Sequence, residues 1–295
     1  MVLLLDTSFL FALFAAFFFT SADLFARAGL HRGVDTFVGG TIVLSTKFIF
    51  LLTIVQLLDV SFPKIGIHYL WILLGGMCNP GLFLIFFMNG ILRIGVSRAA
   101  PIKGTAPLFG AILAILFLGE QPAWYHLFGV IFVTFGIILI SMGKDEEGWK
   151  RKDAIWPILA AISSGVGSIF WKHGLAGFEE VAPASFVGVF AALTIVLSYT
   201  LIRSKNKFSL RPPPAFVSFL LCGLTAGAGI LLLASALKSG EIYRVLPIVE
   251  ISPLLTVLFS VVFLRGSEII TWRTPVGSFF MVGGAILVTL RFGVQ

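Results

Sequence analysis

Charged residues are scarce in this chain. Only 12% of its 295 residues are Asp, Glu, Lys or Arg, whereas about a quarter of an average soluble domain is charged. Hydrophobic residues make up 58%, and apolar runs recur from end to end at roughly the 20 residues that cross a membrane as a helix. This composition leaves no room for a soluble domain and predicts a multi-pass protein integral to the cell (plasma or inner) membrane.

Cysteine and catalytic motifs are also scarce. The two cysteines, Cys78 and Cys222, both fall inside apolar runs and can form neither a disulfide framework nor a Cys-rich metal site. The histidines make no paired metal spacing, and no Gly-rich phosphate loop or GxSxG elbow is present. The net charge is +7, but the basic residues form no continuous patch for nucleic acid. We expect no enzyme, metal, cofactor or nucleic-acid partner.

Charged or turn-rich breaks divide the chain into ten apolar segments. They run over about residues 8–29, 36–58, 67–91, 96–118, 124–142, 154–174, 183–202, 215–237, 242–264 and 272–291. The longest polar interruption, at residues 143–153, separates five segments from five. We therefore expect an all-α membrane protein with ten transmembrane helices: a first five-helix repeat over 1–143, a charged linker loop over 144–153 and a second repeat over 154–295.

The two halves resemble each other. The first half carries Pro101, Pro107, Phe117-Leu118, Glu120, Trp124, Gly129 and Gly136, and the second carries Pro247, Pro253, Phe263-Leu264, Glu268, Trp272, Gly277 and Gly284. The offset is 146 up to Phe-Leu and 148 from Glu onward, and a weaker match near both repeat starts has an offset of 145. Because each unit has an odd number of spans, the second copy enters the membrane from the opposite side. Such inverted repeats are typical of secondary transporters.

Two charges stand in the proline-containing segments. Glu250 lies between Pro247 and Pro253, one residue from the position equivalent to Lys103. A charge at the bilayer centre costs about 2.5 to 3.5 kcal/mol, so such side chains face the bundle interior or a wet pathway. We predict that Lys103 and Glu250 bind substrate in a central cavity, with Glu250 also the candidate for proton coupling. The alternative is a structural ion pair that touches no substrate.

Two further polar residues complete the predicted substrate-binding set. Lys47 lies midway along the second segment, too deep to reach either surface, and is expected to meet an anionic substrate group. A buried pair with Asp23 is the alternative, although Asp23 could instead pair with Arg27 four residues on. Asn79, before Pro80, should break the third segment and line the cavity; close packing through neighbouring glycines is the alternative.

Two blocks carry a family resemblance. Pro101–Ile140 and Pro247–Val288 each contain a mid-span proline, an apolar run and a glycine-spaced closing helix, and the first run ends in Leu-Gly-Glu. They resemble the second half of an EamA-type unit of the drug/metabolite transporter superfamily, although the second copy is two residues longer at the turn. The resemblance implies a ten-span carrier of a small metabolite that works by alternating access. It also implies that Glu120 and Glu268 are helix-end residues.

The orientation of the chain in the membrane is predicted two ways. Loops after odd-numbered spans hold fourteen basic residues and the other loops hold five, so the positive-inside rule places both termini outside the cytoplasm. The family resemblance implies cytoplasmic termini. All six tryptophans fall near segment ends and are expected as interfacial anchors.

These observations predict a secondary transporter of a small, amphoteric or anionic, amino-acid-like metabolite. Its partners would be the small-molecule substrate and the lipid bilayer, with protons as the candidate coupling ion. The alternative is a non-transporting membrane scaffold or receptor with the same fold.

Overall fold

The computed structural model describes residues 6–30, 34–142, 150–204, 215–263 and 272–290. These ranges are helical and contain no β-strand. Eight helical stretches are long and apolar enough to cross a membrane: Thr7–Leu30, Thr36–Leu57, Ile67–Ile94, Arg98–Leu118, Trp124–Ser141, Arg151–Leu175, Val181–Arg203 and Phe216–Ser239. A broken helix over residues 242–263 and a shorter apolar helix, Arg273–Thr289, complete the ten predicted spans.

Some spans consist of more than one helical element. The first repeat contains α1 (Thr7–Leu30), α2 (Thr36–Leu57), α3 (Ile67–Gly76) with α4 (Phe83–Ile94), α5 (Val96–Lys103) with α6 (Ala106–Leu113), and α7 (Trp124–Ser141). The second contains α8 (Ile155–Leu175), α9 (Val181–Ser204), α10 (Phe216–Ser239), α11 (Ile242–Val249) with α12 (Ser252–Phe263), and α13 (Arg273–Thr289). A short π-helical segment, Met77–Leu82, joins α3 to α4 within span three, and another, Ala114–Leu118, follows α6 in span four. A 3-10 turn, Arg151–Ala154, leads into α8.

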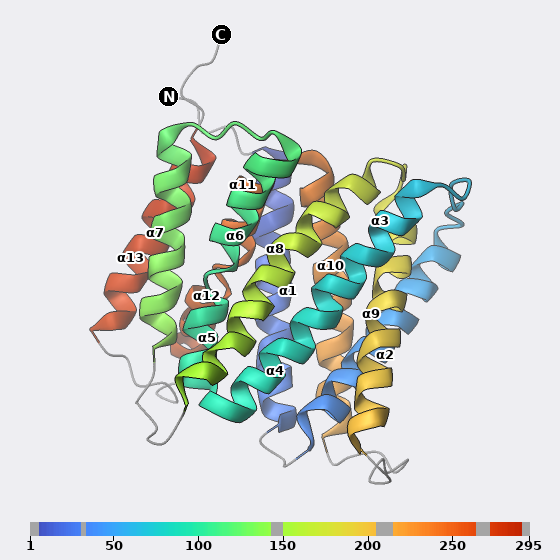
Figure 1. Cartoon of the computed structure of the whole chain (residues 1–295), viewed down its shortest axis with the longest axis horizontal. Helices are drawn as coiled ribbons and strands as arrows, with labels where there is room; N and C mark the ends of the chain where they lie inside the picture. Colours follow the sequence, from blue (N-terminus) through green and yellow to red (C-terminus); the bar gives the residue numbers. More distant parts are fainter. Residues whose placement is uncertain (1–5, 31–33, 143–149, 205–214, 264–271, 291–295) are drawn as a thin grey trace.

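The last helices of the two repeats, α7 and α13, lie side by side (Figure 1) and cross at glycines. A Cβ atom at Gly129 would lie 2.8 Å from the carbonyl oxygen of Gly284, and one at Gly136 would lie 2.6 Å from that of Gly277. Gly129 and Gly136 correspond to Gly277 and Gly284 by the sequence offset of 148. The two contacts are therefore equivalent, as a two-fold axis between the helices requires, and small residues allow this close approach.

The same two-fold relationship between the repeats holds for the other extensive helix–helix contacts. Span one packs on span eight through α1 and α10, and span six packs on span three through α8, α3 and α4. Exchanging the repeats converts the first pair into the second, while α2 and α9, which also pack together, are exchanged with each other. The predicted inverted-repeat architecture is thus confirmed. We call the end of the bundle where α1 begins and α13 ends the terminal end, and the opposite end, where α7 ends and α8 begins, the linker end (Figure 1).

Spans four and nine are both broken near their centres, as the proline pairs predicted. Pro107 has no N–H to donate to the carbonyl of Lys103 four residues earlier, and Pro253 lacks the corresponding donor for Val249. α5 and α11 end at these two residues, and α6 and α12 begin three residues later. Each broken span therefore presents a helix C-terminus and a helix N-terminus to the interior (Figure 1).

Span three is also broken, and α8 supplies the missing hydrogen bonds. Asn79 leaves the helical region with φ −140° and ψ 113°, which confirms the predicted break. Nε1 of Trp171 donates to the carbonyl of Asn79 at 2.9 Å, and the Ser163 hydroxyl donates to the carbonyl of Cys78 at 2.8 Å. The prediction that Trp171 is an interfacial anchor is wrong: its side chain is buried, because its indole N–H is needed at the break.

Candidate functional site

An ion pair joins the breaks of spans four and nine. Nζ of Lys103 lies 2.6 Å from Oε2 of Glu250, and the two side chains are 22% and 19% exposed. Lys103 is the last residue of α5, and Glu250 is the C-cap of α11. A cation is favourable at the negative end of a helix dipole and a carboxylate is not, so the ammonium of Lys103 offsets the unfavourable position of Glu250.

Residues from two other helices surround this pair. Lys103 Nζ lies 5.5 Å from the ring centroid of Phe83 in α4. Asp23 of α1 lies within electrostatic reach of both Lys103 and Glu250, and its Oδ2 accepts a hydrogen bond of 3.3 Å from the hydroxyl of Ser252. Ser252 is the first residue of α12. The break in span nine and the neighbouring α1, α4 and α5 thus bring one lysine and two carboxylates together.

Lys47 is buried in α2, with only 6% of its surface exposed. It forms no hydrogen bond or ion pair with any residue that the structure describes, so the alternative of a Lys47–Asp23 pair is not realised. Cys222 of α10 lies within electrostatic reach of both Lys47 and Asp23. Lys47 therefore stands apart from the ion pair between Lys103 and Glu250.

Asn79 is held against α8. Its Nδ2 donates a hydrogen bond of 3.1 Å to the hydroxyl of Ser164, and its backbone carbonyl is bonded to Trp171. Among the described residues, no hydrogen bond or ion pair connects Asn79 or Lys47 to Lys103 and Glu250. Of the four predicted site residues, the structure brings only these last two into contact.

A second polar contact between the repeats lies at the terminal end. Glu120, in the turn before α7, accepts hydrogen bonds from the N–H groups of Ile242 at 2.9 Å and Tyr243 at 3.3 Å, the first residues of α11. Lys172 of α8 lies 3.7 Å from Oε1 of Glu120 and also donates to the carbonyl of Gly240. Burial raises the pKa of the Glu120 carboxyl, an effect that these N–H groups and Lys172 partly offset.

Glu120 thus occupies the helix-end position that the family turn predicted, while Glu268 lies outside the described residues. Sequence reasoning missed that the Glu120 side chain caps a helix of the other repeat. The only available signal was an acidic residue in a turn, which does not identify a distant partner.

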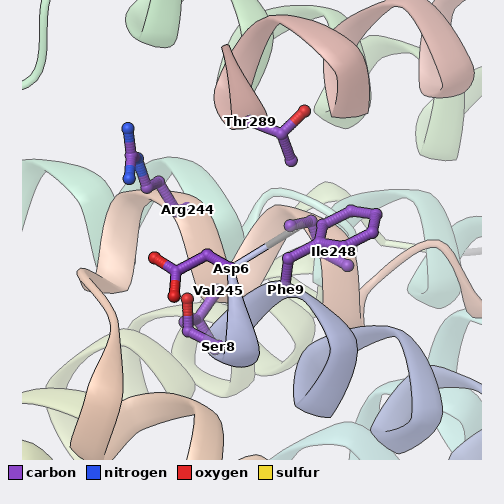
Figure 2. Close-up of a pocket in the computed structure, with 7 residues that line it drawn as sticks. All are labelled: Asp6, Ser8, Phe9, Arg244, Val245, Ile248 and Thr289. Atoms are coloured by element: carbon purple, nitrogen blue, oxygen red, sulfur yellow. The ribbon is translucent and has the colours of Figure 1, made fainter. Parts of the chain in front are cut away.

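A pocket also lies at the terminal end, between the start of α1, α11 and the end of α13 (Figure 2). It is lined by Asp6, Ser8, Phe9, Arg244, Val245, Ile248 and Thr289. None of the predicted site residues lines it. The interior charges, rather than this peripheral pocket, are therefore the candidate site.

Two inverted five-helix repeats, with broken helices and charges where they meet, are the architecture of a multi-pass membrane transporter. The chain belongs to the EamA-like transporter family, whose sequence model matches residues 7–142 and 151–290, and hence to the drug/metabolite transporter superfamily. The predicted family, fold and membrane location are confirmed. A transporter family also agrees with the expectation that the protein is not an enzyme.

Two individual relatives are also described as transporters. A protein of Archaeoglobus fulgidus described as an uncharacterized transporter is 26% identical over 204 residues, which cover 69% of this chain and 70% of the relative. An "uncharacterized transporter in cobO 3'region" of Sinorhizobium sp is 26% identical over 146 residues, 49% of this chain and 99% of the relative. A solved crystal structure with 16% identity superposes with a TM-score of 0.77 over 95% of both chains, which shows a shared fold.

Proposed function

We propose that the protein is a secondary carrier that moves a small amphoteric or anionic metabolite, amino-acid-like in its charged groups, by alternating access. The observation that carries this proposal is the 2.6 Å ion pair between Lys103 and Glu250. It links the two repeats at their helix breaks, where transporter sites form. Charged groups of a substrate can replace either partner, so binding would loosen the link between the repeats.

Lys47 is assigned to the anionic group of the substrate. A buried ammonium without a partner among the described residues gains more from an incoming carboxylate or phosphate than a solvated one does. We assign Asn79 to the same cavity, because its side-chain oxygen accepts no hydrogen bond from the described residues while its amide is fixed by Ser164.

Alternating access requires one end to be closed while the other opens. In support, every residue of α11 except Arg244 is buried, and Glu120 accepts hydrogen bonds from its first residues at the terminal end. At the linker end, the ion pair of 3.1 Å between Arg93 and Asp153 has a 49% exposed arginine. We infer that the structure represents the conformation closed at the terminal end, and that transport requires release of the Glu120 contacts.

Glu250 is the proposed proton-coupling residue. When a substrate group binds Lys103, the Glu250 carboxylate loses its counter-ion. Loss of the nearby positive charge favours uptake of a proton by Glu250. Glu250→Gln should therefore exchange substrate without the pH dependence of the wild type. Unchanged pH dependence in this variant would assign the coupling to another group.

The test is counterflow in proteoliposomes with a labelled pool of amino acids and small anions. The wild type is compared with Lys103→Met and Glu250→Gln, and Lys64→Met, at an exposed loop position, serves as the matched control. We expect saturable exchange in the wild type and the control, loss of exchange in Lys103→Met, and exchange without the wild-type pH dependence in Glu250→Gln. Undiminished exchange by Lys103→Met would place the site elsewhere.

The Lys103–Glu250 contact also favours a second candidate, a non-transporting scaffold or receptor in which the pair only locks the repeats together. That function predicts a well-folded wild type without counterflow of any pool member and site variants whose sole defect is lower stability. Exclusion of water from the Lys103–Glu250 pair at every step of a binding assay would also support the scaffold or receptor function.

We also propose the repeat boundaries 1–143 and 154–295, joined by the linker 144–153, and an orientation with the termini outside the cytoplasm. Fourteen basic residues against five carry the orientation. An epitope tag at the C-terminus should react with antibody on intact cells. Reaction only after permeabilisation would give the reverse orientation.

A further inference from the structure

We propose that His126 is a proton switch, which keeps the terminal end closed while its imidazole is neutral and opens that end when the ring takes up a second proton. The inference goes beyond the proposed carrier function and shares with it only the closure of the terminal end. A switch of this kind needs a protonation state that the fold defines and a contact with the helix that moves. His126 has both.

The hydrogen bonds of His126 define its tautomer. The residue lies in the first turn of α7 and is only 4% exposed. Its Nδ1 accepts a hydrogen bond of 3.1 Å from the backbone N–H of Ala123, the N-cap of α7. A backbone N–H can only donate, so Nδ1 carries no proton. Nε2 therefore carries the proton of the neutral ring and donates it to the carbonyl of Leu290, 3.0 Å away at the end of α13.

This arrangement does not accommodate a second proton on the ring. The proton would go to Nδ1, where it and the N–H of Ala123 would oppose each other as two donors. In a capping box, the side chain at the third helical position accepts from the N-cap N–H, and the imidazole of His126 takes the place of the usual Glu or Gln. Protonation therefore removes the acceptor at the start of α7 and releases the ring from it.

The imidazole also contacts α11, the helix whose first N–H groups are bonded to Glu120. Nη2 of Arg244 lies 3.4 Å from Nε2 of His126, and because both nitrogens carry protons in the neutral tautomer, this contact is not a hydrogen bond. The ring centroid of Tyr243 lies 5.1 Å from that of the imidazole. A positive ring would repel the guanidinium at this distance, so protonation would loosen the first turn of α11 from α7.

Other titratable side chains surround the imidazole and its contacts without removing this conflict. They are Tyr125 of α7, Glu241 before α11, Asp6 before α1, Glu120 in the turn before α7 and Lys172 of α8. Glu241 lies 3.4 Å from Nη1 of Arg244 and is 44% exposed, and Asp6 lines the same pocket as Arg244 (Figure 2). These carboxylates attract a positive ring, but they cannot turn the N–H of Ala123 into an acceptor.

The surroundings of the ring give a proton access from the terminal end. Arg244, which contacts the ring, and Thr289, which precedes Leu290, both line the pocket at this end (Figure 2). Nε of Arg244 is buried and has no hydrogen-bond partner among the described residues, so the pocket offers a polar group to water. An unperturbed histidine titrates at about pH 6.5. Acidification at the terminal end would therefore open it.

The accessibility of a buried cysteine tests the switch without substrate. Val245→Cys, at a pocket position that is 1% exposed, is prepared with Cys78→Ala and Cys222→Ala. Its rate of reaction with N-ethylmaleimide is divided by that of Lys64→Cys, at an exposed loop position in the same background, which removes the ordinary pH dependence of thiol reactivity. We expect this ratio to rise about five-fold from about pH 8 to about pH 5, the effect of one lost N-cap contact on the opening equilibrium.

Substitutions of His126 in this background separate the ring proton from other effects of pH. His126→Gln keeps an acceptor for Ala123 and a donor for Leu290 but does not take up a proton, so its ratio should stay low at both pH values. His126→Arg is positive at both pH values and should give the high ratio throughout. His173→Gln, at an exposed histidine of α8, is the matched control and should retain the change with pH.

Nuclear magnetic resonance in lipid bilayers gives the protonation state directly. The ring nitrogen signals of labelled His126, assigned by their loss in His126→Gln, should show a neutral ring with its proton on Nε2 at about pH 8 and a doubly protonated ring at about pH 5. A ring that stays neutral at the lower pH overturns the switch. So does a reactivity ratio that is independent of pH in the presence of His126, or one that still changes in His126→Gln. Each of these results leaves the carrier function standing, because no substrate takes part in either measurement.

Discussion

The carboxylate of Glu120 lies 3.7 Å from the ammonium of Lys172 and holds the first two N–H groups of α11. Glu120 belongs to the first repeat, and Lys172 and α11 belong to the second. The repeats are therefore tied twice along span nine, here at the terminal end and again at Glu250. A carrier that works by alternating access would have to release the Glu120 contact while α11 stays helical.

The pH dependence of stability should report the Glu120 contact. Burial raises the pKa of its carboxyl above the ordinary 4.5, so the folded protein holds this proton more tightly than the unfolded chain does. That contribution to the free energy of unfolding is fully present below pH 4.5 and is lost as the pH rises through the raised pKa. We expect Glu120→Gln to lack this loss in a Tm series. Glu180→Gln, at an exposed turn, should retain it, and parallel curves for wild type and Glu120→Gln would contradict the assignment.

The Lys103–Glu250 pair should show strong energetic coupling. Removing one partner leaves the other charge poorly compensated, so Lys103→Met and Glu250→Gln should each lower the free energy of unfolding by about 2 kcal/mol. The double variant should lose less than the sum, with a coupling of about 1 to 3 kcal/mol. Denaturation in mixed micelles measures all four proteins. Additive losses would mean that the 2.6 Å contact contributes no net stability.

Replacing Lys47 should stabilise the protein at the expense of activity. A buried ammonium without a described partner is costly, so Lys47→Met should raise the free energy of unfolding by about 2 kcal/mol. The same variant should lose exchange of carboxylate-bearing pool members. Lys64→Met, in an exposed loop, controls for the loss of charge. Destabilisation by Lys47→Met would show that the ammonium has a structural partner.

The α7–α13 contact can be tested with adjacent glycines. A Cβ at Gly284 would lie 2.6 Å from the carbonyl oxygen of Gly129, whereas a Cβ at Gly283 would have nothing within 4 Å. Gly284→Ala should therefore cost about 2 kcal/mol of stability through overpacking. Gly283→Ala should be neutral or stabilising by up to about 1 kcal/mol, since alanine favours the helix. Thermal unfolding of the two variants in one detergent gives the comparison, and equal Tm values would refute the close crossing.

Much of the fold could be predicted because its determinants are local. Apolar segments of bilayer length indicate spans, and a proline at position i removes the donor for the carbonyl at i−4 wherever it occurs. The breaks after Lys103 and Val249 follow from Pro107 and Pro253 alone. The repeat offsets then predict that the two breaks are equivalent.

The directions in which side chains point could not be predicted in the same way. Lipid and protein interior are both apolar, so the composition of a membrane helix does not identify its buried face. Trp171 near a span end was therefore mistaken for an anchor, although it is buried. Asp23 has two candidate partners in the sequence, Lys47 and Arg27, and only the rotation of α1 places it beside Ser252. For the same reason, Lys103 and Glu250 were predicted to be neighbours but Asn79 could not be assigned to α8.

The bonds that α8 makes to the break in span three limit how the protein can move. Trp171 and Ser163 satisfy the carbonyls of Asn79 and Cys78, and these carbonyls would find no substitute donor in hydrocarbon. Separating α8 from span three would cost several kcal/mol for each carbonyl left without a donor. In the proposed alternating-access cycle, we therefore expect spans three and six to move as one rigid body, with the hinges at its borders with the remaining helices.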